Sequence, residues 1–288
     1  MKNKVIAVLL TCHNRKEKTI ACLDSFYTSI KPAGYSFDIY LVDDGSKDGT
    51  GDVIKQMFPS VHYILGTGNL FWAGGMRLAW KTALGNKNYD AFLLLNDDVV
   101  LYNDFLENLI NTDEYAVMND GRKGIYSGAT VDNTTNKITY GGEKITTNHL
   151  IVRRQLLNPL EKPQQCELTN ANILWVSKEV VDTIGIFDER YTHGIADFDY
   201  SLCAIKNDIP VYLAPNIGGI CLFDHGRNWK SKNSSLRERI SYLKSPKGLA
   251  YKEYLFYIKR HFPIYFPYSF TMLWLKTLFP FLWDRFKD

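Results

Sequence analysis

The first hundred residues alternate between short apolar runs and segments of helical or turn character, and this pattern limits the possible fold most strongly. The apolar runs cover residues 5–10, 37–42, 61–65 and 91–95, and helices are predicted between them over residues 18–29, 52–57 and 76–84. Strands joined by helices in this way lie parallel in one sheet. Because the run of residues 91–95 is uninterrupted, we expect it to be a strand covered on both faces, within a mostly parallel central sheet.

The length of 288 residues allows one large α/β domain with an appendage, or two modest domains. The formal net charge is only +3, which gives no electrostatic reason to expect nucleic-acid binding. The five cysteines form no Cys-x-x-Cys pair, so we expect reduced core residues in a cytosolic protein. The apolar run near the N-terminus is too short for a signal peptide, and none is expected.

Asn96 and then two acids, Asp97 and Asp98, follow the apolar run of residues 91–95 directly. Ligands of open α/β sheets bind beyond the carboxyl ends of the strands, and adjacent acids repel each other unless a cation lies beside them. These residues therefore predict a metal site. The alternative is a solvated turn in which Asp98 caps a helix over residues 103–110.

A second pair of acids, Asp43 and Asp44, ends the run of residues 37–42. Carboxylates in this position accept hydrogen bonds from a ribose or from a base N–H. The equally supported alternative is structural, with Ser46 and Asp48 building the turn and capping the next helix.

A glycine-rich segment over residues 66–77 includes Gly74, Gly75 and Arg77. Glycines allow the backbone to approach a ligand closely, and a following helix N-terminus with an arginine favours a phosphate or a sugar. The segment is neither a dinucleotide fingerprint nor a Walker A loop. The alternative is that the glycines serve close helix packing.

Four motifs, over residues 8–15, 42–46, 68–75 and 96–98, resemble those of inverting family 2 glycosyltransferases of the GT-A fold, of the rhamnosyltransferase-like bacterial type. The resemblance implies that a nucleotide sugar is bound by Thr11, Asn14, Arg15, Asp43, Asp44, Asn69, Gly74, Gly75, Arg77, Asn96 and Asp97. It also implies that Asp98 coordinates Mn²⁺ or Mg²⁺ on the donor diphosphate. Many relatives have Pro or Asn in the place of Asp97, which makes Asp98 the safer ligand.

The resemblance resumes over residues 186–203, where it places the catalytic base on Asp197. A carboxylate at a helix start is kept ionised by free N–H groups and the helix dipole, so it can take a proton. Two positions depart from the family pattern, since Ala196 replaces its usual glutamate and Cys203 its usual arginine. These departures leave open that Asp199 shares the role, or that both acids only cap the helix.

Other segments of the second half carry weaker signals. Residues 113–167 suggest short hairpins or a flexible lid, Ser177 is the expected N-cap of a helix ended by Gly185, and residues 209–214 and 219–223 are predicted strands. His225 follows the last strand, where many relatives place a histidine at the metal, although a surface histidine is the alternative. Residues 228–235 are predicted to be mobile and to fold over a diphosphate.

The C-terminal residues 251–288 mix aromatic residues with lysines and arginines. Prolines and Lys276 interrupt the apolar stretch, so a membrane span is not expected. A peripheral membrane contact is favoured over a homodimer interface. The expected organisation is a GT-A domain over residues 1–230, with a Rossmann-like nucleotide-sugar half over 1–110 and an acceptor half over 111–230, followed by a helical segment over 231–288.

The expected activity is a metal-dependent, inverting hexosyl or rhamnosyl transfer from a nucleotide diphosphate sugar to a glycan or lipid-linked saccharide. Bacterial surface polysaccharide synthesis at the cytoplasmic face of the membrane is the setting that the resemblance implies. A sugar-nucleotide pyrophosphorylase is a rival interpretation, but its glycine-rich, lysine-bearing loop after the first strand is missing. The other rival is a catalytically silent binding or scaffolding module, which the departures at Ala196 and Cys203 motivate.

Overall fold

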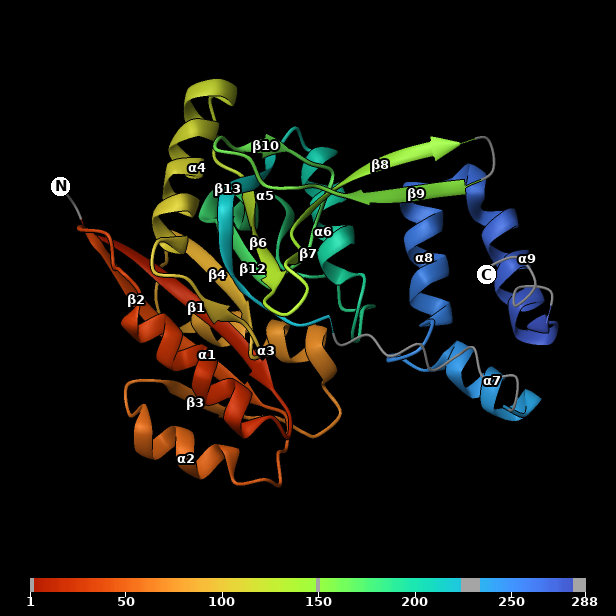
Figure 1. The fold of residues 1–288 in the computed structure, drawn as a ribbon, viewed down its shortest axis with the longest axis horizontal. Helices are drawn as coiled ribbons and strands as arrows, with labels where there is room; N and C mark the ends of the chain where they lie inside the picture. The colour runs from red at the N-terminus through yellow and green to blue at the C-terminus, as the bar shows by residue number, and fades with distance from the viewer. Residues whose placement is uncertain (1–2, 149–150, 224–233, 282–288) are drawn as a thin grey trace.

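The computed structural model describes residues 3–148, 151–223 and 234–281, and it has a mixed central sheet flanked by helices (Figure 1). The main path of this sheet runs in the order β10, β13, β6, β12, β4, β1, β2, β3. The half nearest the N-terminus is parallel, as the alternation of strands and helices predicts. This confirms the expected α/β architecture with a mostly parallel sheet.

The N-terminal half follows the predicted alternation closely. Its elements are β1 (Lys4–Cys12), α1 (Lys16–Thr28), β2 (Tyr35–Asp43), α2 (Thr50–Met57), β3 (His62–Leu65), α3 (Phe71–Asn86) and β4 (Ala91–Asn96). Helix α3 begins five residues before the predicted start at residue 76, so Gly74 and Gly75 lie inside its first turns and not in a loop. The tight turn instead forms upstream, where Gly68 and Phe71 have φ values of 86° and 54°.

The second half corrects three expectations. Its elements on the central sheet are β5 (Val100–Leu101), α4 (Phe105–Asp120), β6 (Ile125–Asp132), β7 (Lys137–Tyr140), β10 (Gln164–Gln165), β12 (Ile173–Ser177) and β13 (Val211–Ile220). The antiparallel pair β6–β7 is a short hairpin, as predicted. However, residues 113–120 continue α4, and β6 is an internal strand between β12 and β13. The two predicted closing strands form one strand, β13, whose register shifts between Leu213 and Ile217.

A hairpin leaves this sheet and forms a small second sheet. It consists of β8 (Gly142–Asn148) and β9 (Ile151–Leu156), with β11 (Leu168–Thr169) paired to β8. Helices α5 (Lys178–Ile184) and α6 (Ala196–Ile205) follow β12. Ser177 is the N-cap residue of α5 and Gly185 its C-cap, as predicted, but the Ser177 hydroxyl donates a hydrogen bond to Asp113 instead of capping the helix.

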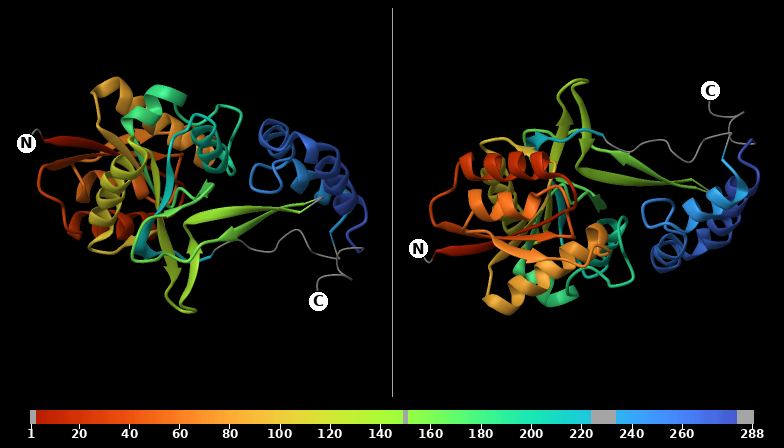
Figure 2. Two further views of the ribbon diagram at one scale, coloured as in Figure 1. Left: turned by 90° about the horizontal axis from the view of Figure 1, so that it is seen from above. Right: turned by 90° about the horizontal axis from the view of Figure 1, so that it is seen from below.

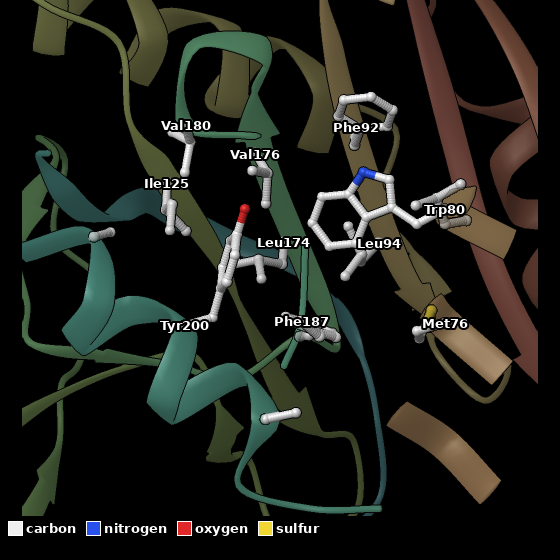
Figure 3. Close-up of a cluster of buried hydrophobic side chains, with 14 of the residues drawn as sticks. Met76, Trp80, Phe92, Leu94, Ile125, Leu174, Val176, Val180, Phe187 and Tyr200 are labelled. Atoms are coloured by element: carbon white, nitrogen blue, oxygen red, sulfur yellow. The ribbon is translucent and has the colours of Figure 1, made fainter. Parts of the chain in front are cut away.

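Side chains of the central strands pack alternately into two hydrophobic clusters, one on each face of the sheet. In β4, Phe92 and Leu94 face the cluster with α3, α5 and α6, whereas Leu93 and Leu95 face the cluster with α1 and α4. Figure 3 shows the first cluster, in which Trp80 lies between the strands and the helices. Full burial of each such side chain stabilises the fold by about 1.5–3 kcal/mol.

The chain ends in a helical segment that lies beside α6 and the β8–β9 hairpin (Figure 2). It contains α7 (Leu236–Lys244), α8 (Tyr251–His261), the 3₁₀ turn η1 (Pro263–Tyr265) and α9 (Phe266–Leu278). Tyr257 and Ile258 of α8 are buried in the main core, so α8 is packed onto the α/β domain. Within the described part of the chain, every helix is too short or too polar to cross a membrane.

Candidate functional site

A cavity of about 170 Å³ lies at the carboxyl ends of the parallel strands. It is lined by Thr11, Cys12, His13, Arg15, Asp44, Gly68, Phe71, Trp72, Asp97, His193 and Lys247. These residues come from the ends of β1, β2 and β4, the start of α3, the segment before α6, and the turn before α8. The cavity therefore occupies the position at which open α/β sheets bind ligands.

Four of the predicted donor-site residues line this cavity, namely Thr11, Arg15, Asp44 and Asp97. The other predicted residues lie around it or point elsewhere, and their contacts follow. His225 lies outside the residues that the structure describes, as do residues 228–233 of the predicted mobile segment.

Asp44 organises the turn that leads into α3. Its Oδ1 accepts a hydrogen bond from the Gly68 N–H at 2.7 Å, and its Oδ2 accepts from the N–H groups of Leu70 and Phe71 at 2.8 and 3.0 Å. The carboxylate thus satisfies free donors at the start of α3 from a different strand. Asp44 therefore stabilises this part of the cavity wall through contacts within the protein alone.

Asp43 and Asn14 connect the loops that follow β1 and β2. Asp43 accepts hydrogen bonds from the Ser46 N–H at 2.8 Å and the Tyr63 hydroxyl at 2.9 Å. Asn14, at a φ of 51°, accepts from the Lys47 N–H, and its own N–H donates to the Ser46 hydroxyl. These contacts agree with the structural alternative, in which the residues after β2 build the turn.

The neighbouring Asp48 has a similar structural role. Its carboxylate accepts hydrogen bonds from the Thr50 N–H at the start of α2 and from the Lys16 N–H at the start of α1. One side chain thus satisfies donors at two helix starts.

Asp97 and Asp98 lie at the end of β4, where they face the cations of α1. Arg15 Nη1 donates to Asp98 Oδ2 at 2.8 Å and lies 3.4 Å from Asp97 Oδ1, and Lys18 Nζ is 3.8 Å from Asp98. Burial raises the pKa of Asp97 to about 7, against the lowering effect of Arg15. Asp98 does not cap α4, whose N-cap is Asp104.

Asn96 fixes an aromatic residue of the cavity wall. Its side-chain oxygen accepts a hydrogen bond from the indole N–H of Trp72 at 2.8 Å. Trp72 in turn packs against Phe187, in the segment before α6. Asn96 thus joins the end of β4 to the start of α3.

Gly75 and Arg77 have structural contacts that differ from the predicted phosphate-binding loop. A Cβ added to Gly75 would lie 2.1 Å from Thr11 Oγ1, so glycine allows α3 to pack directly on the end of β1. Arg77 Nη1 donates to the carbonyl oxygens of Asp188 and Tyr191, at 3.1 and 2.6 Å. Arg77 therefore holds the segment before α6, because its guanidinium is directed to these carbonyls.

At Gly74, an added Cβ would lie 3.3 Å from the Cβ of Leu70, one turn earlier at the N-cap of the same helix. Asn69 is exposed, and its N–H donates to the Thr67 hydroxyl in the turn before α3. Neither residue is among those that line the cavity. The alternative of close helix packing thus accounts for Gly75, which lies against Thr11 of β1.

Asp197 lies in the first turn of α6, four residues after His193 in the cavity wall. Its carboxylate accepts hydrogen bonds from the N–H groups of Ala171 and Phe198, at 3.1 and 3.0 Å. Burial raises its pKa to about 6, although these hydrogen bonds favour the ionised form. A carboxylate with this pKa can accept a proton near neutral pH.

Asp199 is occupied by structural partners. Its carboxylate accepts hydrogen bonds from the Tyr191 hydroxyl at 2.8 Å and from Arg260 Nη1 at 3.0 Å, and His261 Nε2 lies 2.7 Å away. Asp199, Cys203 and His261 also bring their ligand atoms within 4.8 Å of one another, but the Arg260 guanidinium already balances the carboxylate. These contacts favour Asp197 over Asp199 as the base.

Several residues near the site were not predicted from the sequence. His193 and Lys247 enter the cavity from segments far from the N-terminal motifs, and Trp72 is placed by Asn96. On the hairpin, Arg154 stacks over the ring of Phe198 and lies 3.7 Å from Glu143. Only the sequence neighbourhood of Asp197 pointed to His193, and no local signal marked Lys247 or Arg154.

Solved structures with similar folds include a mannosyltransferase, PcManGT from Pyrobaculum calidifontis, in complex with GDP-Man and Mn²⁺. It has a TM-score of 0.52 and 13% identity, over 83% of this chain and 61% of the other. Another is GalNAc-T7 with UDP, GalNAc and Mn²⁺, with a TM-score of 0.58 and 15% identity, over 79% of this chain and 46% of the other. The chain thus spans less than two thirds of either protein. It has the GT-A fold of glycosyltransferases.

Residues 7–171, more than half of the chain, match the model of glycosyl transferase family 2. The chain therefore belongs to glycosyl transferase family 2. A comparison with curated protein sequences gave no match.

Proposed function

We propose that the protein is an inverting glycosyltransferase that moves a hexosyl or rhamnosyl group from a nucleotide diphosphate sugar to an acceptor hydroxyl. One observation carries the proposal. A single cavity gathers Thr11 and Asp44 from the ends of β1 and β2, Asp97 from the end of β4, and His193 from the segment that leads to Asp197. Family membership and the nucleotide complexes of the similar folds support this assignment.

The end of β4 suits a divalent cation. Two carboxylates lie next to each other there, and among the described residues Oδ1 of Asp98 has only a weak thiol contact from Cys221, at 3.7 Å. Oxygen ligands of this type match Mn²⁺ and Mg²⁺. Asp98 and Asp97 would hold the ion, with His225 as the further candidate ligand. When bound, the ion would balance the charge of the leaving diphosphate.

Asp197 is the proposed general base. Its position in the first turn of α6 and its raised pKa suit removal of the acceptor proton as the hydroxyl attacks the sugar. The acceptor would enter from the side of the β8–β9 hairpin, since Arg154 stacks on Phe198 next to the base. A single displacement without a covalent intermediate inverts the configuration at the transferred sugar.

The acceptor is proposed to be a glycan or a lipid-linked saccharide at the cytoplasmic face of a membrane, in the synthesis of a bacterial surface polysaccharide. The C-terminal segment supports this proposal, because it exposes Ile264, Phe270 and Phe279 and also carries Lys276 in the last turn of α9. Exposed rings and cations of this kind bind at the lipid–water interface.

A thermal-shift panel of nucleoside diphosphates and sugar nucleotides, with and without Mn²⁺, tests the donor and the metal together. A ligand that binds only the folded state raises the melting temperature. We expect one nucleotide to stabilise the wild-type protein more strongly with Mn²⁺ than with EDTA, and Asp98→Asn to remove this difference. Donor turnover in EDTA at the full rate would contradict the metal assignment, and nucleotide binding without any turnover would favour the silent binding module.

A further inference from the structure

The C-terminal segment contributes a cationic side chain to the cavity of the proposed donor site. Lys247 lies in the turn between α7 and α8 and is part of the cavity lining, together with Thr11 and Asp44 from the opposite end of the chain. Its ammonium lies 5.8 Å from the centre of the Phe71 ring. Across residues 3–148, 151–223 and 234–281, no carboxylate forms an ion pair with this ammonium.

The turn that carries Lys247 is held tightly. The N–H groups of Gly248 and Ala250 donate to the Ser245 carbonyl, and the Leu249 N–H donates to the Tyr242 carbonyl. A Cβ added to Gly248 would lie 2.0 Å from that Tyr242 oxygen, so the turn requires glycine. The backbone around Lys247 is therefore fixed, although the lysine side chain itself is exposed.

Helix α8, which follows this turn, is anchored next to the cavity wall. Glu253 accepts a hydrogen bond from the Thr192 N–H at 3.0 Å, one residue before His193. Further along the helix, Arg260 and His261 contact the buried carboxylate of Asp199 on α6. Because both ends of α8 are fixed to the segment before α6 or to α6 itself, the turn before α8 stays at the cavity.

We propose that Lys247 binds the diphosphate of the donor, an inference that rests on the proposed function. The other cation of the cavity lining, Arg15, already lies against Asp97 and Asp98. A diphosphate that enters this cavity brings negative charge, and an ammonium without a carboxylate partner suits it. The C-terminal segment thus completes the donor site, in addition to any contact that it makes with a membrane.

Isothermal titration of the full chain with GDP, UDP and dTDP in the presence of Mn²⁺ identifies the nucleotide that binds most tightly. For this nucleotide, we expect Lys247→Ala to weaken binding about tenfold, as for the loss of one hydrogen bond to a charged group. Lys247→Arg should retain most of the affinity. Lys252→Ala, which removes an exposed lysine from the first turn of α8, should bind like the wild type.

The parent nucleoside, measured by competition, separates a phosphate contact from a nucleoside contact. We expect wild type and Lys247→Ala to bind it equally. Equal affinity of wild type and Lys247→Ala for the diphosphate, or an equal loss for nucleoside and diphosphate, would overturn the inference while leaving the proposed function intact. Failure of the wild type to bind any of the nucleotides would instead overturn the proposed function.

Discussion

The guanidinium of Arg260 lies 3.0 Å from Oδ2 of Asp199, and this ion pair joins α8 of the C-terminal segment to α6. Cys203 occupies the position at which the family resemblance leads us to expect an arginine, one helical turn after Asp199, and its Sγ lies 3.7 Å from the same oxygen. The charge partner of Asp199 therefore comes from a helix 61 residues later in the chain.

Arg260→Ala should destabilise the fold by about 1–3 kcal/mol, because it removes a hydrogen bond to a buried carboxylate. The loss is limited because Tyr191 and His261 still contact Asp199. Urea unfolding monitored by circular dichroism measures the change. A second substitution, Cys203→Arg, places a guanidinium one turn from Asp199 and should restore part of the lost stability. If the double variant were no more stable than Arg260→Ala, Cys203 would not be the equivalent position.

Gly75→Ala should destabilise the protein by about 1–3 kcal/mol and weaken nucleotide binding, because the new methyl group would displace Thr11 or α3. Gly85→Ala on the same helix is the matched control, since its new methyl group would meet no described atom within 4 Å beyond the backbone of its own helix and its chain neighbours. That control should stabilise the helix by about 0.5–1 kcal/mol. Thermal unfolding and nucleotide titration of both variants test this difference. Equal stability and equal nucleotide affinity of the two variants would contradict the prediction.

The transfer rate should fall as the pH drops through about 6. Burial raises the pKa of Asp197 to about 6, above its ordinary value, so the carboxylate takes up a proton below that pH and can no longer act as a base. We expect kcat/KM to fall about tenfold per pH unit below this point. This fall is measured by determining kcat/KM for donor and acceptor turnover as a function of pH, within the pH range in which the protein stays folded.

Asp197→Asn and Asp199→Asn separate the base from the structural acid. Asp197→Asn should reduce transfer by about 10²–10⁴ and abolish the pH dependence near 6. Asp199→Asn should mainly lower stability, since it weakens the contacts with Arg260 and His261, and should retain the pH profile. Glu189→Gln, an exposed change in the preceding segment, serves as the control. The reverse pattern for the two acids would assign the base to Asp199.

Local patterns in the sequence predicted the parallel half of the fold, because β1 and β4 are buried on both faces and carry continuous apolar runs. The start of α3 was not predictable in this way, since the carboxylate that satisfies its first N–H groups belongs to Asp44 on another strand. The hairpins expected in residues 113–167 do form, as β6–β7 and β8–β9, but the internal position of β6 between β12 and β13 was not predicted.

The site residues also divide into those that local sequence patterns predict and those that depend on contacts with distant parts of the chain. Thr11, Arg15, Asp44 and Asp97 lie in motifs close to strand ends, and the structure brings them to one cavity. The position of Arg77 after the glycines predicted that it binds a phosphate. Its guanidinium instead donates hydrogen bonds to the carbonyl oxygens of Asp188 and Tyr191, more than a hundred residues away. Contacts of this range depend on how α3 packs against the segment before α6, which periodicity does not encode.

The C-terminal segment should bind anionic vesicles through residues that the structure leaves exposed. The side chain of Ile264 is 88% exposed in η1, and Phe279 follows α9 with its ring partly in solvent. We expect Ile264→Asp with Phe279→Asp to reduce cosedimentation with vesicles, because two apolar contacts are replaced by charges that anionic lipid repels. Met118→Asp is the matched control, since Met118 is 78% exposed on α4, away from this segment.

Binding of the wild type should also weaken as salt rises, because the contribution of the lysines and arginines is screened while that of the rings persists. A homodimer through the same residues predicts instead that the double substitution lowers the molecular mass measured by light scattering and leaves vesicle binding unchanged. A wild-type protein that does not cosediment with anionic vesicles at low salt would exclude the membrane contact.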